Sequence, residues 1–323
     1  MSNTPVITLT MNPALDKSTT VEQVVADRKL RCEPPKWDPG GGGINVSRVL
    51  HRFGIESLAV YPTGGPAGEL LAALLDREGV AQERIAIGEW TRENLTVVER
   101  SSGRQFRFGL PGPSLRESEW RQCLETTEAN VAESSYVVAA GSLPPGVPTD
   151  FFARLATATR EHGARFVLDT SGEALRRALE VGVFLIKPNL REFAALFPDD
   201  DLLDVGLQGA AQSLVEAGSA EVVVVSLGAS GALLASAEGS MRFSAPTVPI
   251  VSRVGAGDSM VAGIVCELVR GAAISEAIRH GVATGSATVT TPGTDLCRVE
   301  DIDRLLTSTV VAPTTHRDSE EPG

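Results

Sequence analysis

The segment Gly255-Ala256-Gly257-Asp258 carries the clearest chemistry in the sequence, and an apolar run over 261–269 follows it. The two glycines let the backbone turn tightly, so that successive N–H groups point into one concavity. The apolar run is typical of a helix, and a helix N-terminus adds partial positive charge at the same place. The segment therefore predicts an anion-binding site.

Asp258 stands at the edge of this anion site, where a bound anion would repel its carboxylate. A carboxylate in that place is useful if it takes a proton from an attacking hydroxyl while the amides hold the charge of a transferred phosphoryl group. Aspartate is also a favoured N-cap residue of helices. On these residues alone, helix capping explains Asp258 as well as catalysis does.

The composition limits the classes of protein to consider. A chain of 323 residues suits one large domain or two small ones, and 42% hydrophobic with 5% aromatic residues favours an aliphatic α/β interior. A net charge of -12 argues against nucleic acid or an anionic membrane as a partner. The sequence lacks a basic leader, an apolar run of membrane-spanning length and paired cysteine spacing, so we expect a cytoplasmic protein. The four cysteines are Cys32, Cys123, Cys266 and Cys297.

Short apolar runs that end in polar or glycine-rich clusters recur along the chain and indicate buried strands. They cover residues 6–10, 58–61, 136–140, 166–168, 184–186 and 222–225. Because the carboxyl ends of parallel strands meet at one sheet edge, we expect these clusters to converge there. Asn189 and Glu192 would share one face of a helix in such a cluster, where they could hold hydrated Mg²⁺ or simply cap the helix. We expect a final apolar helix from Gly281 to Val289.

A run of four glycines, Gly40–Gly43, precedes a further helix. Val46, Val49, Leu50 and Phe53 follow with the spacing of one buried helix face. Four consecutive glycines favour a place where a ligand touches the backbone. Asn45, one turn inside the helix, could then donate to or accept from a hydroxyl group or an anion.

Two segments, 18–37 and 91–108, alternate with a period of two and indicate a small β-sheet outside the main sheet. Lys29 and Arg31 would point to one face of a strand, and Arg92 would add a third cation nearby. Such a face suits either a phosphate group or a wet surface. The apolar residues of an exposed sheet need a cover, and a second copy of the sheet would provide one, so we expect a homodimer.

Taken together, these motifs resemble those of the PfkB (ribokinase-like) carbohydrate kinase family over nearly the whole chain. The resemblance rests on the glycine run with Asn45, the Asn189–Glu192 pair and the Gly255–Asp258 segment. Within the family the chain is most similar to the 6-phosphofructokinase branch of the minor bacterial isozyme type. That similarity rests on Thr8-Leu9-Thr10 with Asp16, Lys29-Leu30-Arg31, the uninterrupted run over 40–46, Trp90-Thr91-Arg92, the Gly141–Gly146 segment and Val225–Gly228.

The resemblance implies a ribokinase-like αβα sandwich with a mostly parallel central sheet and a small β-sheet lid. The kinase domain would cover residues 1–312, with the lid formed by about residues 17–37 and 90–110. A disordered tail would follow over 313–323. The lid sheet would also form the contact of the homodimer.

The resemblance also implies an ATP-dependent kinase that transfers the γ-phosphoryl group of ATP to the 1-hydroxyl of fructose 6-phosphate, giving fructose 1,6-bisphosphate. Asp258 would be the base, and the amides of Gly255, Ala256 and Gly257 would stabilise the transferring group. The implied sugar contacts are Asp16, Gly41 and Asn45 for the hydroxyls, and Lys29, Arg31, Arg92 and Ser142 for the 6-phosphate. The implied ATP and Mg²⁺ contacts are Lys187, Asn189, Glu192, Ser226 and Gly228.

Members of the family often bind a monovalent cation such as K⁺ beside the anion site. The equivalent loops here carry Ser252, Val254, Thr291 and Gly293. Two residues depart from the pattern: Asp295 stands where the branch often has arginine, and Arg253 replaces the more usual threonine.

Two alternatives stay open at this point. The first is 1-phosphofructokinase or tagatose-6-phosphate kinase, although those enzymes usually carry lysine in the glycine run, where Gly42 stands here. The second is a catalytically silent sensor of sugar phosphates. The intact Gly257-Asp258 pair argues against a sensor, because a sensor has no use for a base beside the anion site.

Overall fold

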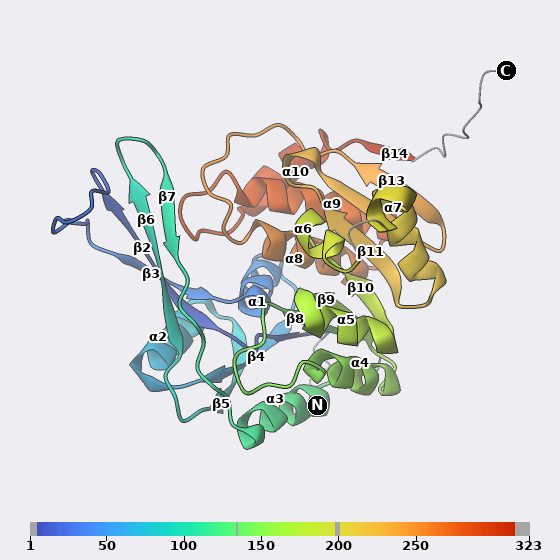
Figure 1. Ribbon diagram of the computed structural model, residues 1–323, viewed down its shortest axis with the longest axis horizontal. Coiled ribbons are helices and arrows are strands. Elements are labelled where there is room, and N and C mark those ends of the chain that lie inside the picture. The colour runs from blue at the N-terminus through green and yellow to red at the C-terminus, as the bar shows by residue number, and fades with distance from the viewer. Residues whose placement is uncertain (1–4, 134, 198–200, 314–323) are drawn as a thin grey trace.

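The computed structural model describes residues 5–133, 135–197 and 201–313 and contains one ten-stranded and one four-stranded sheet (Figure 1). In spatial order the large sheet runs β14 (Val311–Pro313), β13 (Gly239–Phe243), β12 (Ala232–Ser236), β11 (Ala220–Ser226), β10 (Val183–Ile186), β9 (Arg165–Asp169), β8 (Tyr136–Ala140), β1 (Val6–Leu9), β4 (Ser57–Thr63) and β5 (Ala81–Ala86). Neighbours from β11 to β5 are parallel, whereas β12, β13 and β14 join antiparallel. The prediction of a mostly parallel central sheet is therefore confirmed.

The central strands read as continuous apolar runs because both faces of the sheet are covered. In β11, Val222 and Val224 enter one hydrophobic cluster, while Val223 and Val225 enter the cluster on the opposite face. The parallel order also brings the carboxyl ends of β1, β8, β9, β10 and β11 to one edge. The predicted convergence of the polar clusters at that edge is confirmed.

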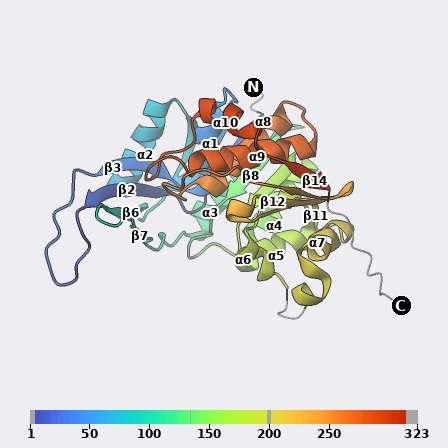
Figure 2. The same cartoon turned by 90° about the horizontal axis from the view of Figure 1, so that it is seen from above.

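Helices cover both faces of the large sheet, which makes the predicted αβα sandwich (Figure 2). One layer contains α1 (Gly42–Arg52), α2 (Gly65–Glu78), α8 (Ala256–Val269), α9 (Ile274–Thr288) and α10 (Val299–Leu306). The other layer contains α3 (Glu117–Ala129), α4 (Phe151–Glu161), α5 (Gly172–Val181), α6 (Leu190–Ala194) and α7 (Asp201–Glu216). Among the described residues, none of these helices combines the length and apolarity that a bilayer crossing requires.

The four-stranded sheet, called the lid below, projects from one side of the sandwich (Figure 1). Its order is β3 (Lys36–Gly40), β2 (Ala14–Val21), β6 (Arg92–Glu99) and β7 (Gln105–Phe108). The expectation of a second, smaller sheet built from both period-two segments is confirmed. Because β2 follows β1 and β3 leads into α1, the lid is joined directly to the glycine run and to the sheet edge where the polar clusters converge.

The prediction that strands continue through residues 18–37 is wrong for the middle of that segment. Residues 22–35 form an exposed loop between β2 and β3, and this loop carries Lys29 and Arg31. Asp27 has a left-handed backbone at φ 59, and the Pro34-Pro35 pair removes two amide donors that a strand would need. The two cations therefore do not share a strand face.

The last apolar helix also begins earlier than expected, since α9 starts at Ile274 and Gly281 lies inside it. A side chain at Gly281 would come within 2.5 Å of Ile264 on α8, so this glycine permits close helix packing. No motif in the sequence predicts the antiparallel strands β12–β14 or the helix α10. Pro313 ends β14, and the remainder of the predicted tail lies outside the described residues.

Candidate active site

The Gly255–Asp258 segment forms the start of α8, as its sequence predicts. Gly255 is the N-cap residue at φ 73, and a side chain there would meet Leu296 Cδ2 at 2.7 Å. The first helical hydrogen bond of α8 is donated by the Ser259 amide to Gly255, at 2.8 Å. The amides of Ala256, Gly257 and Asp258 precede that bond, so they can face an anion at the positive end of the helix.

Asp258 lies in the first turn of α8 and makes no capping hydrogen bond, so the interpretation as an N-cap is wrong. Its Oδ2 accepts a hydrogen bond of 2.8 Å from Nδ2 of Asn45 in α1. The glycine run and the anion site, more than 200 residues apart, thereby meet. Gly41, the N-cap residue of α1 at φ 119, begins the same turn.

Lys187 and Asp169 form a buried ion pair next to the anion site. Lys187 Nζ lies 3.3 Å from Asp169 Oδ2, and a side chain placed on Gly257 would be 3.3 Å from the same nitrogen. Burial raises the pKa of Asp169 to about 6, with Lys187 opposing and the charges of Asp258 and Glu192 adding to the rise. Asp169 was missed in the sequence, although it ends β9 at the edge where the other polar clusters gather.

Asn189 and Glu192 form a capping box at the start of α6. Asn189 Oδ1 accepts from the amides of Arg191 and Glu192 at 2.9 and 3.0 Å, and Glu192 Oε2 accepts from the Asn189 amide at 2.9 Å. The capping alternative is thus what this structure shows. Asn189 also forms a β-bridge with Ser226, the last residue of β11, and β11 leads into the short 3-10 helix Gly228–Ser230. The four residues predicted for the ATP side, at positions 187, 189, 226 and 228, therefore lie at the ends of the neighbouring strands β10 and β11.

The carboxylates at this edge suit a hard, hydrated cation. Glu192 and Asp258 are close enough to Asp169 to raise its pKa, and oxygen atoms of this type are the ligands that Mg²⁺ prefers. Within the described residues, no group of three or more His, Cys, Asp or Glu side chains could enclose a metal ion. Glu192, Asp169 and Asp258 would suit a Mg²⁺ ion that binds mainly through water and phosphate oxygens.

A cavity of about 350 Å³ lies between the lid and the sandwich. Asp16 on β2 lines it, and Asn94 on β6 donates to Asp16 Oδ1 at 2.8 Å. Burial raises the pKa of Asp16, while the Asn94 hydrogen bond and the charges of Arg92 and Arg107 act in the opposite direction. Val254 from the loop before α8 also lines the cavity, which places it beside the anion site.

Arg92 and Arg107 make the cavity attractive to an anion. The Arg92 guanidinium donates to the carbonyls of Asn12, Pro13 and Leu110 at 2.9, 3.4 and 3.1 Å, which position its charge without neutralising it. Arg107 comes from the neighbouring strand β7 and was missed in the sequence, since one arginine in an alternating strand carries no signal of its own.

The other residues predicted for the 6-phosphate are placed differently. Ser142 Oγ accepts a hydrogen bond of 3.0 Å from Asn12 Nδ2, close to Arg92, which contacts the Asn12 carbonyl. Lys29 and Arg31 are exposed on the β2–β3 loop, and neither lines the cavity. Ser142 is thus linked to Arg92 only through Asn12, and of the four residues predicted for the 6-phosphate, only Arg92 lines the cavity.

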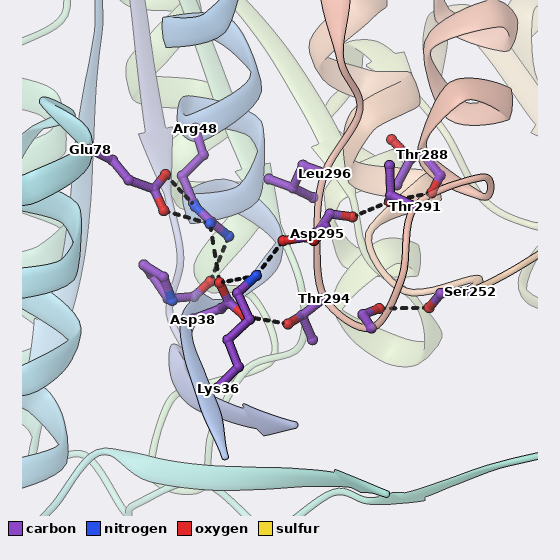
Figure 3. Close-up of polar contacts among 12 residues, drawn as sticks. Lys36, Asp38, Arg48, Glu78, Ser252, Thr288, Thr291, Thr294, Asp295 and Leu296 are labelled. Atoms are coloured by element: carbon purple, nitrogen blue, oxygen red, sulfur yellow. Dashed lines mark hydrogen bonds and ion pairs between the residues drawn. The ribbon is translucent and has the colours of Figure 1, made fainter. Parts of the chain in front are cut away.

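The loops predicted to hold a monovalent cation are adjacent (Figure 3). Ser252 Oγ donates to the Gly293 carbonyl at 2.6 Å, which ties one loop to the other. Thr291 Oγ1 lies 2.7 Å from the Thr288 carbonyl and 2.6 Å from the Asp295 carbonyl. The Asp295 carboxylate forms an ion pair with Lys36 of β3, so this loop is also joined to the lid.

Comparison with known proteins places the chain in one family. Residues 1–301 match the model of the pfkB family of carbohydrate kinases. The chain belongs to this family. The resemblance inferred from the sequence is therefore confirmed.

Individual relatives point to one branch. The chain is 47% identical over 301 residues to the ATP-dependent 6-phosphofructokinase isozyme 2 of Mycobacterium tuberculosis, covering 93% of this chain and 88% of the relative. It is 41% identical to the Escherichia coli isozyme 2, covering 93% and 97%. The 1-phosphofructokinase of Bacillus subtilis is 35% identical, covering 88% and 92%.

The solved structure of E. coli phosphofructokinase-2 with potassium superimposes with a TM-score of 0.88 at 40% identity. The match covers 94% of this chain and 99% of that chain. A tetrameric inhibited form of the same E. coli enzyme also matches, with a TM-score of 0.85. The ribokinase-like fold inferred from the sequence is confirmed.

Proposed function

We propose that this pfkB kinase is an ATP-dependent 6-phosphofructokinase that phosphorylates the 1-hydroxyl of fructose 6-phosphate. The observation that carries the proposal is the position of Asp258. Its carboxylate stands in the first turn of α8, beside the helix amides that precede the first helical hydrogen bond, and shortly after Val254, which lines the cavity. A carboxylate beside an anion site serves a reaction in which a hydroxyl loses a proton as a phosphoryl group arrives.

The transfer needs positioning and charge neutralisation more than covalent chemistry. The sugar 1-oxygen forms a bond to the γ-phosphorus, the bond from that phosphorus to the β–γ bridging oxygen breaks, and ADP leaves. The hydroxyl proton goes to Asp258. Because Oδ2 already accepts from Asn45, the other carboxylate oxygen is the one that takes the proton. The amides of Ala256 and Gly257 hold the charge that develops on the transferring group.

For the sugar, Asp16, Gly41 and Asn45 would hold the hydroxyls, and Arg92, Arg107 and Ser142 would hold the 6-phosphate. The two arginines come from adjacent lid strands and line the same cavity, which supports this assignment. Lys29 and Arg31 would join them only if the β2–β3 loop moves toward the cavity.

On the nucleotide side, Lys187 would contact the phosphates of ATP, because its ammonium group lies beside Gly257. Asn189, Ser226 and Gly228 would line the remainder of the ATP site. Mg²⁺, held near Glu192 through water, would neutralise phosphate charge. K⁺ would bind at the joined loops that contain Ser252, Val254, Thr291 and Gly293.

We further propose that the protein forms a homodimer through the lid face that carries Leu95, Phe106 and Phe108, which the register of β6 and β7 places on one side. Phe108 of β7 is 51% exposed, and Phe106 and Leu95 are only half-buried. A sheet with apolar residues on an open face is stabilised when a second sheet covers it. Sedimentation of the protein with Phe108→Glu would shift toward monomer if this is the contact.

Gly42 favours 6-phosphofructokinase over its sister enzymes. A side chain at this position would meet Ala140 Cβ at 2.8 Å, so the backbone has no room for the lysine that the sister enzymes usually carry there. The silent-sensor alternative is disfavoured because Asn45 holds the Asp258 carboxylate in a fixed position. A protein that only binds sugar phosphates would not need a carboxylate held there.

The decisive experiment is the initial rate of ADP formation with ATP–Mg²⁺ and fructose 6-phosphate, fructose 1-phosphate or tagatose 6-phosphate. We expect a clear preference for fructose 6-phosphate. Arg92→Ala should raise KM for this sugar about tenfold or more, because one charge-assisted contact to the phosphate is lost. A preference for fructose 1-phosphate would overturn the assignment of the arginines, and no turnover with any sugar would favour the sensor.

A further inference from the structure

Arg48 is an almost fully buried cation in α1, one helical turn after Asn45. Only 3% of it is exposed. Its Nε and Nη2 donate to the two carboxylate oxygens of Glu78 at 2.8 and 2.6 Å, and Nη1 donates to the Pro39 carbonyl at 3.0 Å (Figure 3). Because an unpaired buried charge is costly, such complete pairing indicates that this place requires a guanidinium group.

The partners of Arg48 come from three different elements. Glu78 is the last residue of α2, where the helix dipole disfavours a carboxylate. The ion pair with Arg48 explains why a glutamate stands at this position. Asp38 of β3 lies 3.8 Å from Arg48 Nη2 and accepts a hydrogen bond of 2.6 Å from Thr294 Oγ1. Arg48 thus joins α1 and α2 to the base of the lid, as Figure 3 shows.

Arg48 also determines which way the Asn45 amide points. Arg48 Nη1 donates to Asn45 Oδ1 at 3.4 Å, and Asn45 Nδ2 donates to Asp258 Oδ2 at 2.8 Å. A guanidinium can only donate and a carboxylate can only accept. The amide between them therefore has one stable orientation, since the reverse would set donor against donor and acceptor against acceptor.

We propose that Arg48 is a positioning residue for phosphoryl transfer. It fixes the Asn45 amide so that the amide nitrogen holds one oxygen of Asp258 and leaves the other free for the sugar hydroxyl. This rests on the proposed role of Asp258 as the base. Lysine should not replace Arg48, because one ammonium group cannot reach both Glu78 oxygens, Pro39 and Asn45 at once.

The test is a double-mutant cycle of Arg48→Lys and Asn45→Ala, assayed with fructose 6-phosphate at enzyme concentrations that allow a residual rate to be measured. Arg48→Lys alone should lower kcat about 10- to 100-fold, because a small displacement of the base is costly. KM for ATP should stay the same, since the nucleotide-side residues lie on other elements. In the Asn45→Ala protein, Arg48→Lys should change kcat by no more than about twofold.

A purely structural role gives different results. Arg48→Lys would then lower kcat by the same factor with and without Asn45, and that outcome overturns the proposal, as does an unchanged kcat. Arg165→Lys is a control for the same substitution at an arginine remote from the site. Its guanidinium bonds to the Tyr136 hydroxyl at the opposite end of β9 from Asp169, so kcat should not change.

Two further measurements keep the outcomes distinct. If Arg48→Lys does not fold, Glu78→Gln can replace it, because it weakens the ion pair that holds the Arg48 guanidinium. We expect Glu78→Gln to lower kcat by a smaller factor than Arg48→Lys, and to have no such effect in the Asn45→Ala protein. If Glu78→Gln lowers kcat equally in both proteins, the proposal fails. Asp258→Asn is assayed separately, and normal turnover in that variant would refute the base itself rather than the part played by Arg48.

Discussion

Gly255→Ala tests whether the backbone conformation and the close packing at the N-cap of α8 require glycine. The residue has φ 73, and a left-handed backbone costs a residue with a side chain about 1–2 kcal/mol. The new methyl group would also lie 2.7 Å from Leu296 Cδ2, and overpacking of this kind adds about 1–3 kcal/mol. We therefore expect Gly255→Ala to lower the free energy of unfolding by about 2–5 kcal/mol.

The chain offers a control that separates these two contributions. Gly271, just after α8, has φ 82, and a side chain there would meet no atom within 4 Å. Gly271→Ala should thus cost only the backbone contribution, about 1–2 kcal/mol, and leave kcat unchanged. Leu296→Val, which removes the clashing methyl group, should recover part of the loss in the Gly255→Ala protein.

Urea unfolding, followed by circular dichroism, measures the free energy of unfolding of the wild type, Gly255→Ala, Gly271→Ala, Leu296→Val and the Gly255→Ala/Leu296→Val double variant. Steady-state rates measure kcat. Gly255→Ala should lower kcat as well, because the amides that follow it change direction. Equal costs for Gly255→Ala and Gly271→Ala would refute the steric argument. A Gly255→Ala protein with normal kcat would refute the claim that this glycine aims the anion-site amides.

Two other predictions concern the carboxylates of the site. Asp258→Asn should still bind both substrates, measured by calorimetry, but lose about 10²–10⁴-fold in kcat, because the proton acceptor is gone; near-normal turnover would contradict this. The pKa of Asp169 is raised to about 6 from an ordinary 3.8, so folding favours its neutral form. That advantage is complete below about pH 4 and is lost as the pH rises through 6, so wild-type stability should fall relative to Asp169→Asn by up to about 3 kcal/mol between pH 4 and pH 7. Urea unfolding of both proteins at several pH values measures the difference, and a constant difference would show that the carboxyl titrates normally.

Several features follow from the sequence because they depend on local backbone requirements. The Gly255–Asp258 turn, the glycine run before Asn45 and the polar ends of the parallel strands need particular residue types at fixed spacing. Two-fold alternation likewise marks the lid strands β6 and β7. These patterns are visible in the chain whatever surrounds them, so fold class, family and the candidate base could be predicted.

The same local reasoning fails where a long-range partner decides the structure. Lys29 and Arg31 have strand spacing, but without a neighbouring strand to pair with they lie in a loop. For Asn189 and Glu192 the sequence leaves both metal binding and helix capping open, with capping favoured by these two residues alone, and the structure shows the capping bonds.

What the sequence by itself determined is the set of chemical groups and the sandwich that carries them. Only the tertiary structure decided how those groups act on one another. The pairing of Lys187 with Asp169, the shared cavity of Arg92 and Arg107, and the line from Arg48 through Asn45 to Asp258 each join distant segments. The physical reason is that charge and hydrogen bonding act over a few ångströms of space, which the order of residues along the chain does not fix.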